Sequence, residues 1–482
     1  MRIRKRRSTT SPINLPPLDA GWLWLESESN LMHGSILAVF RRPPGTSPEF
    51  VYDLVERMRS AVVATKPFDL RLRRKGFGRV WPQWEQVDHV DTNYHVRHSA
   101  LPWPGTEREL GRLVSHIHSV PLDKAHPLWT FDVIEGLSDD RFAVLGKMHH
   151  ALADGVAGIR LFQHWLSDDP TDFGVAPMWV KGMPPRSFRP AEVPRALMDT
   201  TTYRRTLAGW ARGLTQPLRA VADGLPALRL AATGTAAHPW GAPRTVLNTP
   251  ITGHRRVATQ SYSLSTFRAL ADAIDGTIND VVLTVCAGGL RRYLSEIDAL
   301  PSRALTTNIP VSTRARDSTR QVGNSISWAM VPLPTHLSDP CARTEVVRAS
   351  TRKAKERLDR IRGAAINTYT LAVTTPILLE QVCKLGGRTR PYFNVPISNV
   401  PGPRTPMFLD GAELVDIHAS TVIYHGQALN IVCLSYGDKL EFSFTACSTA
   451  LPQVQRLAVH CGEELALLES LYADQPAAAV EA

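Results

Sequence analysis

The amino-acid sequence predicts an α/β protein that is built from more than one domain. The chain has 482 residues, which is more than one hydrophobic core usually holds. Apolar residues make up 43% and charged residues 21%, a composition typical of globular proteins. Strand-like and helix-like segments alternate on both sides of residues 170–255, a stretch rich in proline, glycine, alanine and arginine. We therefore expect an N-terminal domain at 1–185, a linker with broken helices at 186–250 and a C-terminal domain at 251–482.

The N-terminal region shows helical periodicity and apolar strand patterns in turn. Its expected elements are a short helix within 18–31 with Asp19 as candidate N-cap, a strand at 35–40, helices at 50–63 and 107–118, strands at 130–137 and 141–150, and a helix at 154–166. The two later strands are separated by a polar turn at residues 138–140, so we expect them to lie next to each other.

The C-terminal region repeats the mixture of strands and helices. Its most apolar helix is expected at 277–294, and a closing helix at 452–471. Strands are expected at 305–310, 327–332, 428–436 and 439–445, the last two flanking Gly437-Asp438 as a hairpin.

Charge and cysteine usage limit the class of protein. The net charge is +10, and basic runs lie at residues 2–7 and 71–79, which suits anionic partners or simply a solvated surface. No nucleic-acid-binding signature is present, so we expect no nucleic-acid partner. The six cysteines contain no C-x-x-C pair, which favours reduced, mostly buried thiols over disulfides or a zinc site. No apolar run approaches about 18 residues and no signal peptide is evident, so we expect a cytoplasmic protein.

The strongest chemical signal is the segment from Lys147 to Gly155, which ends an apolar strand and begins a helix. Adjacent strand residues face opposite sides, so His149 and His150 cannot both enter one cavity. We therefore expect one packed and one functional histidine, and no two-histidine metal site. Asp154 is expected to cap the helix or pair with a cation, and Gly155 to allow close packing or a positive φ. The alternative is a core histidine pair with a capping aspartate.

This segment resembles the H-H-x-x-x-D-G motif of the CoA-dependent acyltransferase superfamily. Further blocks at residues 17–33, 121–129, 276–294 and 397–403 resemble those of the bacterial wax ester synthase/diacylglycerol acyltransferase family. The resemblance spans nearly the whole chain. It implies two similar chloramphenicol-acetyltransferase-like domains, each a mixed sheet flanked by helices, with a channel between them.

The resemblance also implies a reaction. The partners would be acyl-CoA, as co-substrate and not as a bound cofactor, and an acceptor hydroxyl on diacylglycerol or a long-chain alcohol. His150 would be the general base beside His149, with Asp154 holding their loop. No covalent acyl-enzyme is required, which fits the absence of a G-x-S-x-G elbow.

Other candidate site residues lie in the C-terminal blocks. Asn279 sits at the start of the apolar helix, where the helix dipole suits an oxyanion, and Asp280 occupies the N3 position of a capping box with Thr277. Pure capping is the alternative. Asn399 lies in a segment that reads as a turn, and the resemblance places it near the channel. Gly323 and Asn324 form either a plain turn or part of the acyl path.

The chain also departs from the family pattern. His126 stands where arginine is commoner, and Thr130 where an acidic residue is commoner. Residues 440–453 lack the usual glycine and aspartate, and Cys447 and Ser448 stand about where an acidic residue is expected. These changes indicate either an altered acceptor pocket or a weakly active paralogue.

Residues 195–229 interleave arginines with leucines and Trp210, a pattern that suits an anionic bilayer or lipid-droplet surface. A linker helix on the domain seam is the alternative. Two other functions stay open beside the O-acyltransferase. One is a condensation-type acyltransferase that uses a carrier protein, and the other is a weakly active or non-catalytic lipid-body protein.

Overall fold

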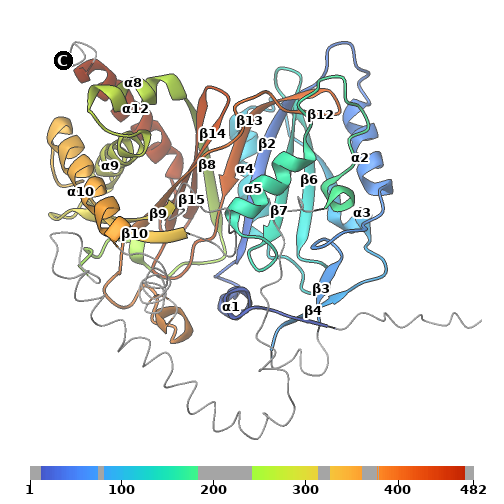
Figure 1. Ribbon diagram of the computed structural model, residues 1–482, viewed down its shortest axis with the longest axis horizontal. Helices are drawn as coiled ribbons and strands as arrows, with labels where there is room; N and C mark the ends of the chain where they lie inside the picture. Colours follow the sequence, from blue (N-terminus) through green and yellow to red (C-terminus); the bar gives the residue numbers. More distant parts are fainter. Residues whose placement is uncertain are drawn as a thin grey trace, which may run out of the picture.

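Two six-stranded sheets stand side by side in the computed structural model, each with helices packed against it (Figure 1). The structure describes residues 12–73, 81–182, 241–312, 326–360, 377 and 379–472. The expected α/β class with two sheet-rich units is confirmed. Residues 195–229 and the pair Gly323 and Asn324 lie outside the described residues, as do residues 2–7 of the basic N-terminus.

The first sheet has the strand order β12-β13-β2-β7-β6-β5. Its strands are β2 (His33–Arg41), β5 (Val96–Ala100), β6 (Trp129–Leu137), β7 (Arg141–His149), β12 (Phe408–Leu409) and β13 (Ala412–Ser420). Only β5 and β6 pair in parallel within it. Strands β6 and β7 have a neighbour on each side, and their long apolar runs explain why both were evident in the sequence.

Helices cover both faces of this sheet. Buried side chains of α2 (Phe50–Ser60), α5 (Gly155–Trp165) and α6 (Met178–Lys181) share one apolar cluster with the sheet. On the other face, α4 (Glu107–Ser119) packs Leu110 and Val114 against Leu37 and Leu145. The short helix α3 (Thr92–His95) lies beside β5.

The second sheet has the order β10-β9-β11-β14-β15-β8. Its strands are β8 (Arg255–Ser263), β9 (Leu305–Ser312), β10 (Ile326–Leu333), β11 (Val395–Val400), β14 (Leu429–Tyr436) and β15 (Lys439–Cys447). Strand β11 runs parallel to both of its neighbours. The helices that share its core are α8 (Leu264–Ala273), α9 (Ile278–Glu296), α10 (Pro340–Arg360) and α12 (Val454–Tyr472).

Three smaller features lie outside the two large sheets and their covering helices. A three-stranded sheet joins β1 (Ile13–Asn14), β4 (Gln83–Gln86) and β3 (Leu70–Leu72), and α1 (Pro17–Leu25) lies near it at the lower edge of the first sheet (Figure 1). A single 3₁₀ turn, η4, covers Val246–Asn248.

The first sheet includes a segment from the C-terminal part of the chain. Strands β12 and β13 come from the C-terminal part of the chain, yet β13 pairs antiparallel with β2 of the first sheet. Leu414 and Ile417 of β13 are buried in the first sheet's apolar cluster. The domain boundaries at 185 and 250 stay a prediction, but the N-terminal sheet is completed by C-terminal residues.

Two local predictions need correction. Asp19 does not cap α1, because the helix begins two residues earlier after Pro16 and Asp19 lies within its first turn. Residues 398–400, the first half of the segment 398–403 that was expected to turn, form the end of β11. Serine and asparagine favour turns, but here the parallel ladder to β14 outweighs that local preference.

By itself, no helix in the described part of the chain has the length and apolarity that crossing a bilayer requires. Helices α8 and α9 reach this length and apolarity only together, with a bend of 99° between them.

Candidate active site

The histidine pair lies where β7 ends and the chain turns into α5. His149 is the last residue of β7 and faces His33 of β2 in the strand register. The His150 N–H donates to the Met32 carbonyl at 2.8 Å, and the Leu152 N–H donates to the His149 carbonyl at 2.9 Å. These bonds form a tight turn that separates the two imidazoles.

His149 is the packed member of the pair. Its side chain is fully buried, and its Nδ1 accepts a hydrogen bond from the Ala151 N–H at 3.0 Å. A neutral imidazole that accepts at Nδ1 carries its proton on Nε2. That Nε2 lies 3.5 Å from the Glu26 carboxylate, whose other oxygen lies 2.5 Å from Lys124 Nζ. His149 therefore orders the turn rather than entering an open cavity.

His150 is only partly buried, and its ring stacks on Trp22 with 4.3 Å between ring centroids. Its Nδ1 is buried and has no hydrogen-bond partner in another described residue. Burial lowers the pKa of His150 to about 4, although the charge of Asp154 and a bond to its own backbone act in the opposite direction. The ring is therefore a free base at neutral pH, the state that a proton acceptor needs.

Asp154 caps α5 as expected, because its carboxylate accepts the Ala157 N–H at 2.7 Å. Its negative charge also acts on Asp19 of α1. Burial, and after it the charge of Asp154, raises the pKa of Asp19 to about 6.

Gly155 differs from its prediction. Its φ is not positive, and a Cβ built on it would meet no atom within 4 Å. Neither close packing nor a left-handed backbone explains this glycine, which faces open space at the start of α5.

A polar cluster that the sequence analysis did not predict lies behind His149. His33 Nε2 is 2.9 Å from the His118 carbonyl, and the buried Lys147 ammonium donates to the carbonyls of Ile117 and Val120 at the end of α4. Burial lowers the pKa of Lys147 to about 8 and that of His118 to about 3. Among the described residues, no group of three or more histidine, cysteine, aspartate or glutamate side chains could hold a metal ion.

The segment between α1 and β2 links this site to the second sheet. Arg255 of β8 donates to the Ser29 carbonyl at 2.8 Å. The His425 N–H donates to the Asn30 side chain at 3.2 Å. The same segment supplies Met32 to His150 and Glu26 to His149, so residues of both sheets determine where the histidines lie.

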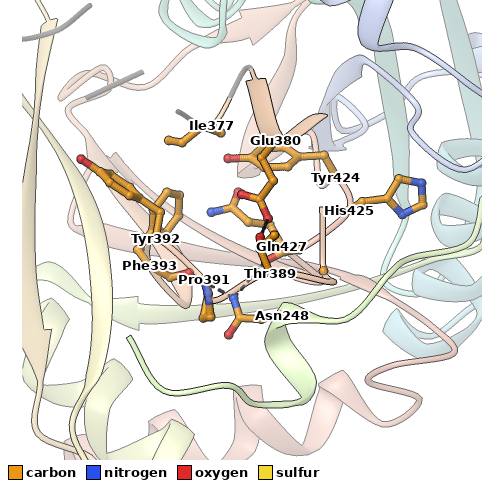
Figure 2. A pocket seen from close by; sticks show the side chains of 12 residues that line it. Asn248, Ile377, Glu380, Thr389, Pro391, Tyr392, Phe393, Tyr424, His425 and Gln427 are labelled. Atoms are coloured by element: carbon orange, nitrogen blue, oxygen red, sulfur yellow. Dashed lines mark hydrogen bonds between the residues drawn. The ribbon is translucent and has the colours of Figure 1, made fainter. Parts of the chain in front are cut away.

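Figure 2 shows a small pocket beside this link, with His425 projecting from it toward the N-terminal part of the chain. Polar side chains from several segments line it, among them Asn248, Glu380, Thr389 and Gln427. Glu380 accepts a hydrogen bond from Thr389 at 2.6 Å, and burial raises its pKa. The Gln427 amide nitrogen is buried without a hydrogen-bond partner among the described residues.

Asn279 and Asp280 lie in the first turn of α9, which packs against α8, α10 and α12 (Figure 1). Asp280 forms the capping box with Thr277 that the sequence predicted, and its other carboxylate oxygen accepts from Thr351 at 2.5 Å. Asp280 therefore explains how α9 begins, as in the capping alternative, and the oxyanion role of Asn279 stays a prediction.

Asn399 lies nearer the junction of the two sheets. It is partly exposed near the end of β11, and the next residue, Val400, packs on the same apolar cluster as Met148 of β7. Gly402 approaches the Ser435 backbone so closely that a Cβ there would lie 2.1 Å from the carbonyl oxygen. This contact holds the segment after β11 against β14.

The residues that depart from the family pattern are packed into the structure. His126 stacks on Tyr94 at 3.9 Å, and Thr130 is buried opposite Lys147 in the β6–β7 ladder. Cys447 is buried at the end of β15, where its thiol is 3.0 Å from the Thr449 hydroxyl and accepts the Thr252 N–H at 3.5 Å. At the position where the family usually has an acidic residue, this chain therefore has a thiol that contacts hydroxyl and amide groups.

Sequence reasoning missed Trp22, Glu26 and Lys124, which all touch the histidine pair directly or through one intermediate. All three lie in the blocks 17–33 and 121–129 that carry the family resemblance. Nothing in their local pattern shows what they contact, because the partners are far away in the chain.

A two-sheet α/β fold with a histidine pair at a strand-to-helix turn defines an acyltransferase of the H-H-x-x-x-D-G class. Comparison with known proteins identifies the family. Residues 15–282 match the wax ester synthase/diacylglycerol acyltransferase catalytic domain, and residues 322–469 match the C-terminal domain of the same family. The chain belongs to this family and is an O-acyltransferase.

Individual relatives agree over nearly the full length. The chain is 37% identical to the O-acyltransferase WSD of Acinetobacter baylyi, covering 96% of this chain and 98% of that protein. It is also 37% identical to a probable diacylglycerol O-acyltransferase of Mycobacterium tuberculosis, covering 94% and 98%. The wax ester synthase/diacylglycerol acyltransferase of Marinobacter aquaeolei is similar in structure, with a TM-score of 0.75, 31% identity and coverage of 95% and 100%.

A more distant structural likeness shows the fold alone. The first condensation domain of the calcium-dependent antibiotic synthetase has a TM-score of 0.57 and 18% identity, covering 98% of both chains.

Proposed function

We propose that this O-acyltransferase moves a long-chain acyl group from acyl-CoA to the hydroxyl of diacylglycerol or a long-chain alcohol. The observation that carries the proposal is His150, a neutral, partly exposed imidazole at the strand-to-helix turn. The names of the relatives support the acceptor class, since they include a wax ester synthase and diacylglycerol O-acyltransferases.

In the proposed reaction His150 removes the proton from the acceptor hydroxyl as its oxygen attacks the thioester carbonyl. A carbon–oxygen bond forms, and the carbon–sulfur bond of the thioester then breaks. The protonated His150 returns the proton to the leaving sulfur, so the products are an ester and free CoA thiol. Such general-base assistance contributes about 10²–10⁴-fold to a rate.

The other motif residues have supporting roles in this proposal. His149 orders the turn, Asp154 caps α5, and the open space at Gly155 leaves room for substrate beside His150. Asn399 is a candidate channel residue because it lies where the two sheets meet. Asp280 caps the start of α9, and Asn279 beside it stays the candidate oxyanion donor.

The test is release of CoA thiol from palmitoyl-CoA, with and without dioleoylglycerol or hexadecanol. The proposal requires release that depends on the lipid alcohol. Release that needs an acyl group on a carrier protein would indicate a condensation-type enzyme instead. A folded protein that releases no thiol above background with any of these substrates would indicate a non-catalytic lipid protein.

Because such acceptors reside in lipid phases, we also propose peripheral contact with an anionic membrane or lipid-droplet surface through residues 195–229. Its support is the arginine, leucine and tryptophan pattern of that segment. Cosedimentation with phosphatidylglycerol vesicles tests it, with Arg204→Gln/Arg205→Gln/Arg212→Gln as the variant. The variant should bind less, and binding equal to that of the native chain would contradict the proposed contact.

A further inference from the structure

One face of α1 touches the catalytic motif at several points. Asp19, Trp22 and Glu26 are spaced three and four residues apart, which places them along one side of a helix and its C-terminal end. Trp22 stacks on the His150 ring, and Glu26 pairs with His149 Nε2. Asp19, at the N-terminal end of this face, experiences the charge of Asp154.

We propose that Trp22 and Glu26 are positioning residues for the acyltransfer reaction, which hold the imidazoles of His150 and His149 in their working orientation. The inference rests on the proposed function of His150. It adds two residues outside the H-H-x-x-x-D-G motif to the machinery that the motif defines.

Glu26 acts through His149. Its side chain is 5% exposed, and its two oxygens face His149 Nε2 at 3.5 Å and Lys124 Nζ at 2.5 Å. A buried carboxylate without partners would be costly, so the lysine is what allows a charged group here. The carboxylate favours the His149 tautomer with its proton on Nε2, and this tautomer leaves Nδ1 free to accept the Ala151 N–H. The Ala151 bond fixes the turn on which His150 stands.

Trp22 acts on His150 directly. The indole covers one face of the imidazole at 4.3 Å and 30° between ring planes. No hydrogen bond from another described residue holds the buried Nδ1 of this ring. Ring stacking is therefore the main side-chain contact that restricts its rotation, and it also keeps water from that face.

The segment that follows α1 ties this face to the second sheet. Arg255 holds the Ser29 carbonyl and the His425 N–H holds the Asn30 side chain, both between Glu26 and β2. The position of α1 over the histidines is therefore set by contacts from both sheets.

The chain offers matched controls for both residues. Trp24 is on the opposite side of α1 and 53% exposed, with its ring edge-on to Trp81. Glu28 is an exposed carboxylate two residues beyond Glu26. Trp24→Leu and Glu28→Gln remove the same kinds of group without touching the motif.

The first experiment measures kcat and KM for ester formation in a double-mutant cycle. Glu26→Ala should lower kcat by about 10²-fold with KM unchanged, because a misplaced reacting group costs rate rather than binding. Glu26→Gln, which keeps an oxygen toward His149, should recover part of that loss. In a His149→Ala background the Glu26→Ala change should cost little more. Native kcat in Glu26→Ala, or equal losses in both backgrounds, would overturn the role of Glu26.

The second experiment does not depend on turnover. Histidine ring signals are titrated by NMR, and the His150 signal is assigned by its loss in His150→Gln. Trp22→Leu should move the His150 titration upward, toward the ordinary value of about 6.5, while Trp22→Phe and Trp24→Leu should leave it near that of the native chain. An unchanged titration in Trp22→Leu would overturn the role of Trp22. Because this readout needs no substrate, it also separates failure of the positioning role from failure of the proposed reaction.

Discussion

Two adjacent histidines of the same chain have different environments, and this difference defines the site. His149 is buried with both ring nitrogens facing partners, whereas His150 is partly exposed against one tryptophan. The end of β7 explains the difference, because His149 is the last residue of the strand and His150 is the first residue of the turn that follows. A general base must contact its substrate, so the partly exposed ring is the one suited to catalysis.

The low pKa of His150 has a direct consequence for the pH profile of kcat/KM. Because burial lowers that pKa to about 4, the free-base form persists through neutral and mildly acidic pH. We expect kcat/KM to stay level from pH 7.5 to about 5 and to fall as the pH approaches 4. Steady-state rates in overlapping buffers, at pH values where the protein is folded, measure this. An acidic limb centred near 6.5 would show an imidazole in contact with water.

Asp154 permits a separate test of capping and charge. Its carboxylate accepts the Ala157 N–H at the start of α5, and asparagine caps a helix about as well as aspartate. We expect Asp154→Ala to lower the free energy of unfolding by about 1 kcal/mol, and Asp154→Asn to lower it much less. Chemical denaturation measures both, and equal losses would show that the charge rather than the cap stabilises the protein.

At the residue scale the sequence predicted His149, His150 and the Asp154 cap, because strand alternation and capping are local rules. It could not predict Glu26 or Lys124. The contacts of Glu26 with Lys124 and with His149 join three segments that are distant in the chain, and only the folded structure brings those segments together. The oxyanion role expected of Asn279 stays a prediction, since a helix N-terminus shows its dipole locally but not what it faces.

Among the elements, α1 is short and its local signals are weak, yet it covers the histidine turn. Helices such as α2, α4 and α9 were predictable from apolar periodicity and capping residues. Strand β13 was not predicted, because it comes from the C-terminal part of the chain and pairs with β2 of the first sheet. The end of β11 was mistaken for a turn because pairing with β14 overrides its turn-forming residues.

The segment after β11 depends on a glycine. A Cβ at Gly402 would lie 2.1 Å from the Ser435 carbonyl oxygen, so one of the two backbones would have to move. We expect Gly402→Ala to lower the free energy of unfolding by about 1–3 kcal/mol. Gly155→Ala is the control, because a Cβ there meets no atom within 4 Å. Denaturant titrations compare them, and equal stability of the two variants would contradict this packing.

Helices α10 and α12 are joined by a buried ion pair. Arg343 and Glu464 contact each other with side chains only 3% and 1% exposed. Removing Arg343 leaves the buried Glu464 carboxylate with only the partly exposed Arg292, whose Nε lies 3.4 Å away. Arg343→Met should therefore lower the free energy of unfolding by about 3 kcal/mol. Arg268→Met, which breaks an exposed pair with Asp438, should cost no more than about 1 kcal/mol. Similar losses for the two variants would contradict the importance of burial.

Over the whole molecule, the two sheets act as one unit around the histidine turn. Strand β13 enters the first sheet from the C-terminal part, and Arg255 of the second sheet holds the segment that follows α1. The α/β class and the separation into two sheet-rich regions were predictable from alternating patterns. How the sheets meet was not, because packing between them leaves no periodic signal in either region.

Acidification should destabilise the whole molecule. Burial lowers the pKa of a set of histidines that fold in the neutral form: His33, His95, His118, His150 and His418. The unfolded chain takes up these protons near pH 6.5, whereas the folded one does not, so stability falls as the pH drops below that value.

Four carboxyls with a raised pKa oppose this trend: Asp19, Asp132, Glu380 and Glu441. Burial raises the pKa of Glu441 to about 8 and that of Asp19 to about 6, so each favours the folded state as the pH falls. They are outnumbered by the histidines. We expect the free energy of unfolding to fall by several kcal/mol between pH 7 and 5, at about 1.4 kcal/mol per pKa unit. Denaturation at pH 7, 6 and 5 measures it, and constant or rising stability would contradict neutral burial of these rings.

The most direct measurement is product analysis by mass spectrometry. The native chain, His150→Ala and a control, His164→Ala at an exposed position on α5, are incubated with palmitoyl-CoA and either dioleoylglycerol or hexadecanol. We expect an ester from the native chain and the control, and its loss in His150→Ala. Ester formation by a folded His150→Ala protein at the native rate would contradict the assignment of His150 as the base.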